Sequence, residues 1–122
     1  MQLDRFFKER PQISPTIYAY TLPEANSHNG YIKVGFTDRS VEERITVPVL
    51  TAGLKPIILF KEPAMCADGS CFTDKDVHRL LERKGCKRLN PLDKTDEWFR
   101  CSVPDIMAAI LSLRTGVANE EN

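Results

Sequence analysis

The sequence predicts a small domain of the mixed α/β (α+β) class, in which a sheet of few strands is flanked by helices. Apolar and polar residues alternate over residues 16–22 and again over 30–36, which is typical of half-buried strands. Residues 74–84 instead carry apolar side chains at helical spacing, and residues 105–114 form a second helical run. A short chain that combines the two-residue period of strands with the 3.6-residue period of helices is expected to pack a sheet against helices.

Composition and charge limit the possible functions. With 122 residues, 42% hydrophobic and 28% charged, the chain is long enough for one compact domain whose core needs no disulfides. Its 17 basic and 17 acidic residues give a net charge of zero, so overall charge does not indicate a polyanionic partner. No apolar run approaches the roughly 18 residues of a membrane helix, and the N-terminus lacks the apolar region of a signal peptide. We expect a cytoplasmic protein without a membrane partner.

The two alternating segments place polar side chains on one face of the predicted sheet. Tyr18 and Tyr20 share a face in the first strand, and Tyr31 and Lys33 share a face in the second. The opposite face is expected to be core. The connecting loop ends in Asn29-Gly30, which favours a hairpin with a long connection. His28 in that loop is either a solvated or a catalytic side chain.

A short helix is predicted directly after the second strand. Ser40 and Glu43 have the spacing of a capping box, which places Arg44 about one turn into the helix and facing back toward the strands. Pro48 prevents the helix from running far. Arg39 lies in the turn before the cap and competes with Arg44 for any role in charge stabilisation.

The remaining predicted elements support this stretch. Residues 56–61 form an apolar run between two prolines, which predicts a buried third strand. The others are a short amphipathic helix over residues 3–9, a helix from Thr73 to about Lys84 that ends at Gly85, a short strand over 97–101, and a last helix that begins at Ser102 and Pro104 and ends at Gly116. We therefore divide the chain into an N-terminal extension (1–15), one domain (16–115) and a polar tail or cut linker (116–122).

The four cysteines are expected to be reduced thiols, because no secretory signal accompanies them. Cys66 and Cys71 flank a probable loop, and Cys86 and His78 lie further along the chain. The spacing differs from the close Cys-x-x-Cys pair of common zinc modules, so zinc binding by Cys66, Cys71 and Cys86 or His78 stays an open alternative.

Four segments in order resemble the GIY-YIG endonuclease superfamily, in its divergent branch associated with restriction and phages. These are IYAY, then YIKVGFTDRSVEER, then DKDVHRLL and DEWFR, and the resemblance covers roughly residues 16–110. It implies a three-stranded, mainly antiparallel sheet between helices. It also implies cleavage of DNA phosphodiester bonds that depends on a divalent metal, Mg²⁺ or Mn²⁺.

The resemblance assigns roles to four residues of the first stretch. Tyr18 would help to deprotonate the attacking water, although Thr16 stands where the family signature has glycine. Lys33 replaces the second signature tyrosine and would hydrogen-bond a phosphate or polarise water. Gly35 would let the backbone approach a neighbour or substrate closely. Arg44 would stabilise charge that develops on the phosphoryl oxygens.

The metal ligand is the position that departs from the family pattern. The family places a glutamate about one turn before a histidine, whereas here Asp74 precedes His78. An aspartate binds magnesium but is one methylene shorter. His78 either orients a water or phosphate or is a structural helix histidine. Asp76, Glu82 and Glu97 stay open as alternative ligands, although for Glu97 the resemblance implies a role that anchors its strand. Trp98 is expected to be a core aromatic.

A basic cluster extends from the second half of the 74–84 helix. Such a patch holds a phosphate backbone without reading base sequence, but cations near a helix C-terminus are also common for electrostatic reasons. The candidate DNA-binding residues are Arg39, Arg79, Arg83, Lys84, Lys87 and Arg88.

Two functions follow from these expectations. The first is a metal-dependent DNA endonuclease that acts by activated-water attack. The second is a catalytically weak or inactive nucleic-acid-binding module of a larger restriction or helicase protein, which the Asp74 substitution and the zero net charge favour. The sequence leaves open the DNA structure that is cut, nicking or double-strand cleavage, and the oligomeric state.

Overall fold

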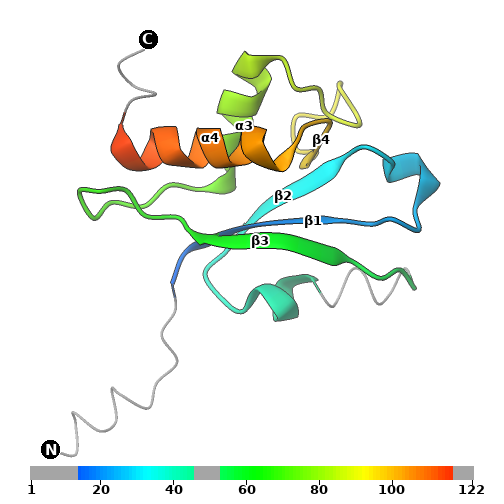
Figure 1. The fold of residues 1–122 in the computed structure, drawn as a ribbon, viewed down its shortest axis with the longest axis horizontal. Coiled ribbons are helices and arrows are strands. Elements are labelled where there is room, and N and C mark those ends of the chain that lie inside the picture. The colour runs from blue at the N-terminus through cyan, green and yellow to red at the C-terminus, as the bar shows by residue number, and fades with distance from the viewer. Residues whose placement is uncertain (1–13, 46–52, 117–122) are drawn as a thin grey trace, which may run out of the picture.

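A computed structural model describes residues 14–45 and 53–116. These residues form one four-stranded antiparallel sheet with helices on both faces (Figure 1). The elements are β1 (Thr16–Thr21), the 3-10 turn η1 (Asn26–His28), β2 (Ile32–Thr37), a helical segment at residues 41–45, β3 (Ile57–Pro63), α3 (Asp74–Lys84), β4 (Trp98–Phe99) and α4 (Val103–Thr115). The strand order is β3-β1-β2-β4.

The predicted α+β class is confirmed, with one more strand than the three expected. The short strand predicted near residues 97–101 is present as β4, and it joins the sheet at the edge of β2. Its register pairs Ile32 with Phe99 and Lys33 with Trp98. This pairing fixes the backbone beside Glu97, whose carbonyl accepts a hydrogen bond from the Val34 amide at 3.0 Å.

The two faces of the sheet support two separate apolar clusters. Helices α3 and α4 cover one face, where Ile17, Val34 and Phe99 are fully buried. The segment 41–45 lies on the other face (Figure 1), where Tyr18, Tyr20 and Leu22 pack with Val41 and Ile45. The predicted alternation is therefore confirmed. The tyrosine face, however, is largely covered, and Tyr18 is only 3% exposed.

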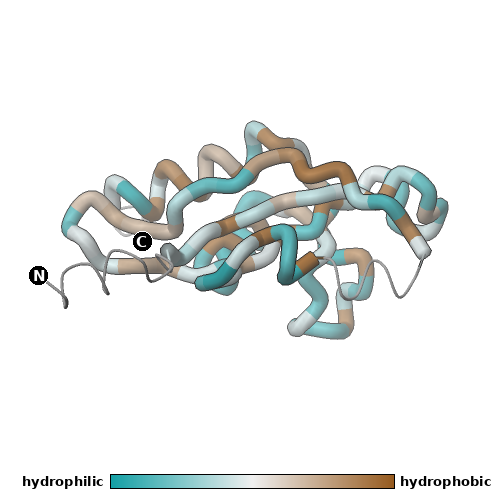
Figure 2. The backbone as a smooth tube through the Cα atoms, turned by 90° about the horizontal axis from the view of Figure 1, so that it is seen from below, coloured by the Kyte–Doolittle hydropathy of each residue, from teal (hydrophilic) through white to brown (hydrophobic). Residues whose placement is uncertain are grey.

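Strand β3 differs from the prediction of a buried strand. Its residues alternate between exposed and half-buried, and Ile57 and Leu59 are exposed although residues 57–60 are an apolar run (brown in Figure 2). The prediction was wrong because β3 is an edge strand whose only strand neighbour in the described sheet is β1. Edge position cannot be deduced from the hydrophobicity of the run alone.

The two long helices begin and end where their capping residues predict. The Thr73 and Ser102 hydroxyl oxygens each accept a hydrogen bond from an amide of the first turn. In return, the Asp76 and Asp105 carboxylates accept hydrogen bonds from the amides of the two capping residues. Gly85 ends α3 with φ 101°, a left-handed conformation that favours glycine. The helix predicted over residues 3–9, the region of Pro48 and the tail after residue 116 lie outside the described residues.

The buried face of α3 carries two ionisable residues. Its buried side chains are Asp74, Val77, His78 and Leu81, which follow helical spacing and face the sheet. Acidic residues are rarely buried unless they have a partner. Asp74 and His78 are therefore held against β2 for a reason other than hydrophobic packing.

Candidate active site

An open cleft of about 790 Å³ lies on the tyrosine face of the sheet. It brings together Tyr18, Lys33 and Arg44, three residues that are separated by up to 26 positions in the sequence. Arg39 also lines it. The complete lining is Tyr18, Tyr20, Lys33, Phe36, Thr37, Asp38, Arg39, Glu43 and Arg44.

Tyr18 is positioned by the glycine opposite it. Tyr18 and Gly35 are register partners on β1 and β2, and the phenol ring lies directly over Gly35. A Cβ at residue 35 would lie 2.4 Å from both Cζ and Oη of Tyr18. The neighbour that approaches Gly35 is thus the proposed catalytic side chain itself.

The pKa of the Tyr18 hydroxyl lies above its ordinary value of 10.0. Burial raises it most, and the nearby Glu97 carboxylate raises it further, whereas a hydrogen bond with Arg44 and the positive charge of Arg44 act in the opposite direction. At neutral pH the phenol therefore keeps its proton.

Arg44 reaches the cleft from the helical segment 41–45. Ser40 caps this segment, because its Oγ accepts from the Glu43 amide at 3.4 Å and its carbonyl accepts from the Arg44 amide at 3.1 Å. Val41 and Ile45 anchor the segment through their burial beneath the sheet. Arg44 itself stays exposed.

The carboxyl groups of Asp74 and Glu97 meet next to Lys33. Lys33 Nζ lies 2.8 Å from Glu97 Oε1, and the side chains of Glu97 and Asp74 are hydrogen-bonded to each other. Burial, followed by the hydrogen bond and the charge of Glu97, raises the pKa of Asp74 to about 6. Burial alone would raise the pKa of Glu97, but the hydrogen bonds with Asp74 and Lys33 lower it. Below about pH 6 the pair therefore holds a proton, and that proton lies on the Asp74 side.

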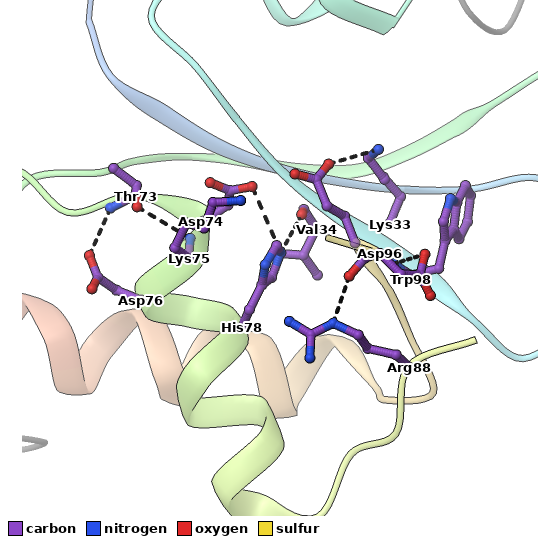
Figure 3. Close-up of polar contacts among 11 residues, drawn as sticks. Lys33, Val34, Thr73, Asp74, Lys75, Asp76, His78, Arg88, Asp96 and Trp98 are labelled. Atoms are coloured by element: carbon purple, nitrogen blue, oxygen red, sulfur yellow. Dashed lines mark hydrogen bonds and ion pairs between the residues drawn. The ribbon is translucent and has the colours of Figure 1, made fainter. Parts of the chain in front are cut away.

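His78 points at the backbone of β2 (Figure 3). Its Nε2 donates to the Val34 carbonyl at 2.8 Å and lies 3.9 Å from Asp74 Oδ2. Burial lowers the pKa of His78, so the ring is neutral near pH 7. In this arrangement the histidine holds α3 to the sheet beside Asp74, and its predicted role toward water or phosphate stays a prediction.

Asp74 and Glu97 are the residues that fit a divalent cation best. Two carboxyl groups in hydrogen-bond contact repel each other when both are ionised, and a bound cation would remove that repulsion. Across residues 14–45 and 53–116, no three His, Cys, Asp or Glu side chains gather as a metal site. A magnesium ion would therefore take its other ligands from water and substrate phosphate, as this ion commonly does. Cys66, Cys71 and Cys86 are free thiols outside any such group within the described residues.

Most of the predicted DNA-binding cations on and after α3 have protein partners. Arg79 pairs with Asp76 at 2.9 Å, and Lys84 pairs with Asp105 at 2.7 Å. Arg88 is largely buried, pairs with Glu82, donates to the Asp96 carbonyl at 2.8 Å and lies over the Phe99 ring. The enclosure of Arg88 indicates a structural role, whereas Arg79 and Lys84 are 63% and 54% exposed, and their contact with DNA stays a prediction. Arg83 and Lys87 are exposed, as is Arg39 at the cleft.

Glu97 is a site residue that the sequence left open, as an alternative metal ligand or as the structural anchor of its strand. Its backbone does anchor β4 to β2, as expected. Its carboxylate also affects the pKa values of Tyr18, Tyr20, Asp74 and His78, which makes it the central charge of the site. Glu97 directly precedes Trp98, which pairs with Lys33 in the sheet. This pairing brings Glu97 close to Lys33, but it is known only once the register of β4 on β2 is known.

Comparison with known proteins identifies the family. The family model of the T5orf172 domain matches residues 16–114, most of the chain. The chain belongs to the T5orf172 domain family. No curated protein and no solved structure matches the chain. The T5orf172 domain is a nucleic-acid-associated domain.

This assignment corrects the resemblance drawn from the sequence. The assignment to the GIY-YIG superfamily was wrong, because the matching family is the T5orf172 domain, a distinct family, and no GIY-YIG model matches. The segments that suggested it are two paired strands, a capped helix and a short edge strand. The fold itself requires these elements, so they do not distinguish one family from another. None of the helices among the described residues of this T5orf172 domain is long and apolar enough to cross a membrane.

Proposed function

We propose that this T5orf172 domain is an endonuclease that hydrolyses DNA phosphodiester bonds with a divalent metal, Mg²⁺ or Mn²⁺. The observation that supports it most is the convergence of Tyr18, Lys33 and Arg44 on one open cleft, with the Asp74–Glu97 pair beside it. A nucleophile-orienting hydroxyl, two cations and a carboxyl pair are the groups that phosphodiester hydrolysis requires.

Each residue has a task that follows from its chemistry. Tyr18 holds the attacking water through its hydroxyl oxygen, and the adjacent Arg44 charge lowers the cost of removing a proton there. The planar fork of Arg44 binds two phosphoryl oxygens and stabilises the negative charge that grows on them. Lys33 and Arg39 hold the flanking phosphates.

Asp74 and Glu97 would hold the metal, whose contribution when bound is to neutralise phosphate charge and to lower the pKa of a water ligand. The protein's part is to supply the two carboxylates from α3 and from the residue before β4. His78 fixes the turn of α3 on which Asp74 lies, through the Val34 carbonyl.

A second function, a binding module without cleavage, is favoured by one observation. The Asp74 and Glu97 carboxyls are already satisfied by each other and by Lys33, and Asp74 is only 8% exposed. In that case Lys33, Arg39 and Arg44 would hold DNA, and chemistry would come from another domain of a longer protein.

A nicking assay on supercoiled plasmid separates the two functions. We expect nicking in Mg²⁺ or Mn²⁺ that is lost in chelator and falls at least about 100-fold in Tyr18→Phe and Asp74→Ala. Lys94→Ala, which removes an exposed cation from the loop between α3 and β4, is the matched control and should nick like the wild type. Salt-dependent DNA binding without nicking in either metal would refute the endonuclease and support the binding module.

A further inference from the structure

Lys33 belongs to two arrangements at once. It lines the cleft with Tyr18 and Arg44, yet its ammonium lies 2.8 Å from Glu97, whose side chain is hydrogen-bonded to Asp74. The carboxyl pair thus already holds one positive charge, which the protein itself supplies. A lysine is suited to such a place, because its charge is compact and its four-carbon stem is flexible.

The Lys33–Glu97 pair is better shielded from water than most other ion pairs in the described part of the chain. Its side chains are 22% and 25% exposed, compared with 54% and 25% for Lys84 and Asp105 at the far end of α3. Reduced exposure strengthens the attraction and reduces screening by salt. A second cation can therefore approach Glu97 only by competing with the ammonium.

We propose that Lys33 is a built-in counter-cation of the Asp74–Glu97 pair, that a divalent cation displaces it, and that the released ammonium then binds a phosphate in the cleft. This inference rests on the proposed function for its metal and its substrate. It predicts that the cation and DNA each favour the same state, in which Lys33 is turned away from Glu97. By linkage, each ligand then increases the affinity for the other.

The first test measures Mn²⁺ binding by titration calorimetry in the absence of DNA. Removal of the competing charge in Lys33→Met should tighten Mn²⁺ binding by about five-fold, within the range expected for a partly exposed ion pair. Glu97→Gln should weaken it. Lys61→Met removes a lysine from an ion pair of the same length, 2.8 Å to Glu42, and is the matched control, which should bind Mn²⁺ like the wild type.

The second test measures the salt dependence of DNA binding with and without Ca²⁺. Without the divalent cation, wild type and Lys33→Met should have the same slope of log affinity against log salt, because Lys33 is held by Glu97. With Ca²⁺ the wild-type slope should be steeper than that of Lys33→Met by about one, the value for one additional phosphate contact. Lys61→Met should follow the wild type in both conditions.

The two tests separate this inference from the endonuclease proposal. Tighter Mn²⁺ binding in Lys33→Met supports the inference even if the protein never nicks DNA. Unchanged or weaker Mn²⁺ binding in Lys33→Met overturns it, even if the wild type is an active nuclease. A thermal unfolding curve of each variant verifies folding, and Lys33→Gln provides a second variant if Lys33→Met does not fold.

Discussion

The contact between Gly35 and Tyr18 offers the sharpest prediction from the geometry. In Gly35→Ala the new Cβ would lie 2.4 Å from Cζ and Oη of Tyr18, whereas carbon atoms in contact are roughly 3.5 to 4 Å apart. The phenol must therefore retreat by about 1 Å. Gly35 does not have a positive φ, so the backbone itself accepts alanine and the whole effect comes from this overlap.

The overlap has two expected consequences. Overpacking of this kind costs about 1–3 kcal/mol of unfolding free energy, which urea titration measures. A displacement of about 1 Å at a catalytic group lowers the rate by about 100-fold, which the nicking assay measures. Both effects should appear together, because the same ring movement causes them.

Two comparisons make the Gly35→Ala result interpretable. Gly85→Ala lies at the C-terminus of α3 with φ 101° and open space around it, so it should cost about 1 kcal/mol through backbone strain and leave nicking unchanged. In a Tyr18→Leu background, Gly35→Ala should lose most of its stability penalty, because the clashing ring atoms are gone. An equal loss of stability in both backgrounds would show that the Tyr18 ring is not the cause of the Gly35→Ala penalty.

Two further predictions concern charge. Because burial and Glu97 raise the pKa of Asp74 from 3.8 to about 6, the folded protein binds this proton more tightly than the unfolded chain and loses stability as pH rises through that range. Asp74→Asn should therefore be more stable than the wild type at pH 8, by about 1 kcal/mol, with the difference shrinking toward pH 4 in urea titrations; a pH-independent difference would contradict this. Arg88→Ala should destabilise the domain by about 2 kcal/mol, since it leaves the carbonyl of the buried Asp96 without its donor. Arg39→Ala should instead keep stability and lower the salt slope of DNA binding by about one. A loss of stability in Arg39→Ala together with a loss of DNA binding in Arg88→Ala would contradict this assignment of the two arginines.

Local sequence patterns predicted the elements of this fold well. The alternation around Tyr18 and Lys33, the Ser40 cap, and the Thr73 and Gly85 boundaries of α3 each depend on neighbouring residues, and the structure confirms them. The convergence of Tyr18, Lys33 and Arg44 on one face was also predictable, since strand alternation and cap position determine it.

The features that sequence could not give depend on contacts between distant segments. Strand β3 was expected to be buried, but its edge position is a property of sheet order. Glu97 could not be decided between a ligand and a strand anchor, because its approach to Lys33 and Asp74 requires the register of β4 on β2. Arg88 was expected to face DNA, because nothing near it in sequence shows that Phe99 and Asp96 will enclose it.

In the proposed endonuclease, Arg44 acts on the reacting phosphate from the Tyr18 cleft. Single-turnover cleavage of a short labelled duplex, with protein in excess and Mn²⁺ present, tests it directly for Arg44→Ala and Arg44→Lys. The account predicts that both variants bind the duplex but cleave at least about 100-fold more slowly, because a lysine ammonium cannot replace the planar two-pronged contact. Cleavage by Arg44→Ala at the wild-type rate would contradict the account and move the chemistry, if any, away from this cleft.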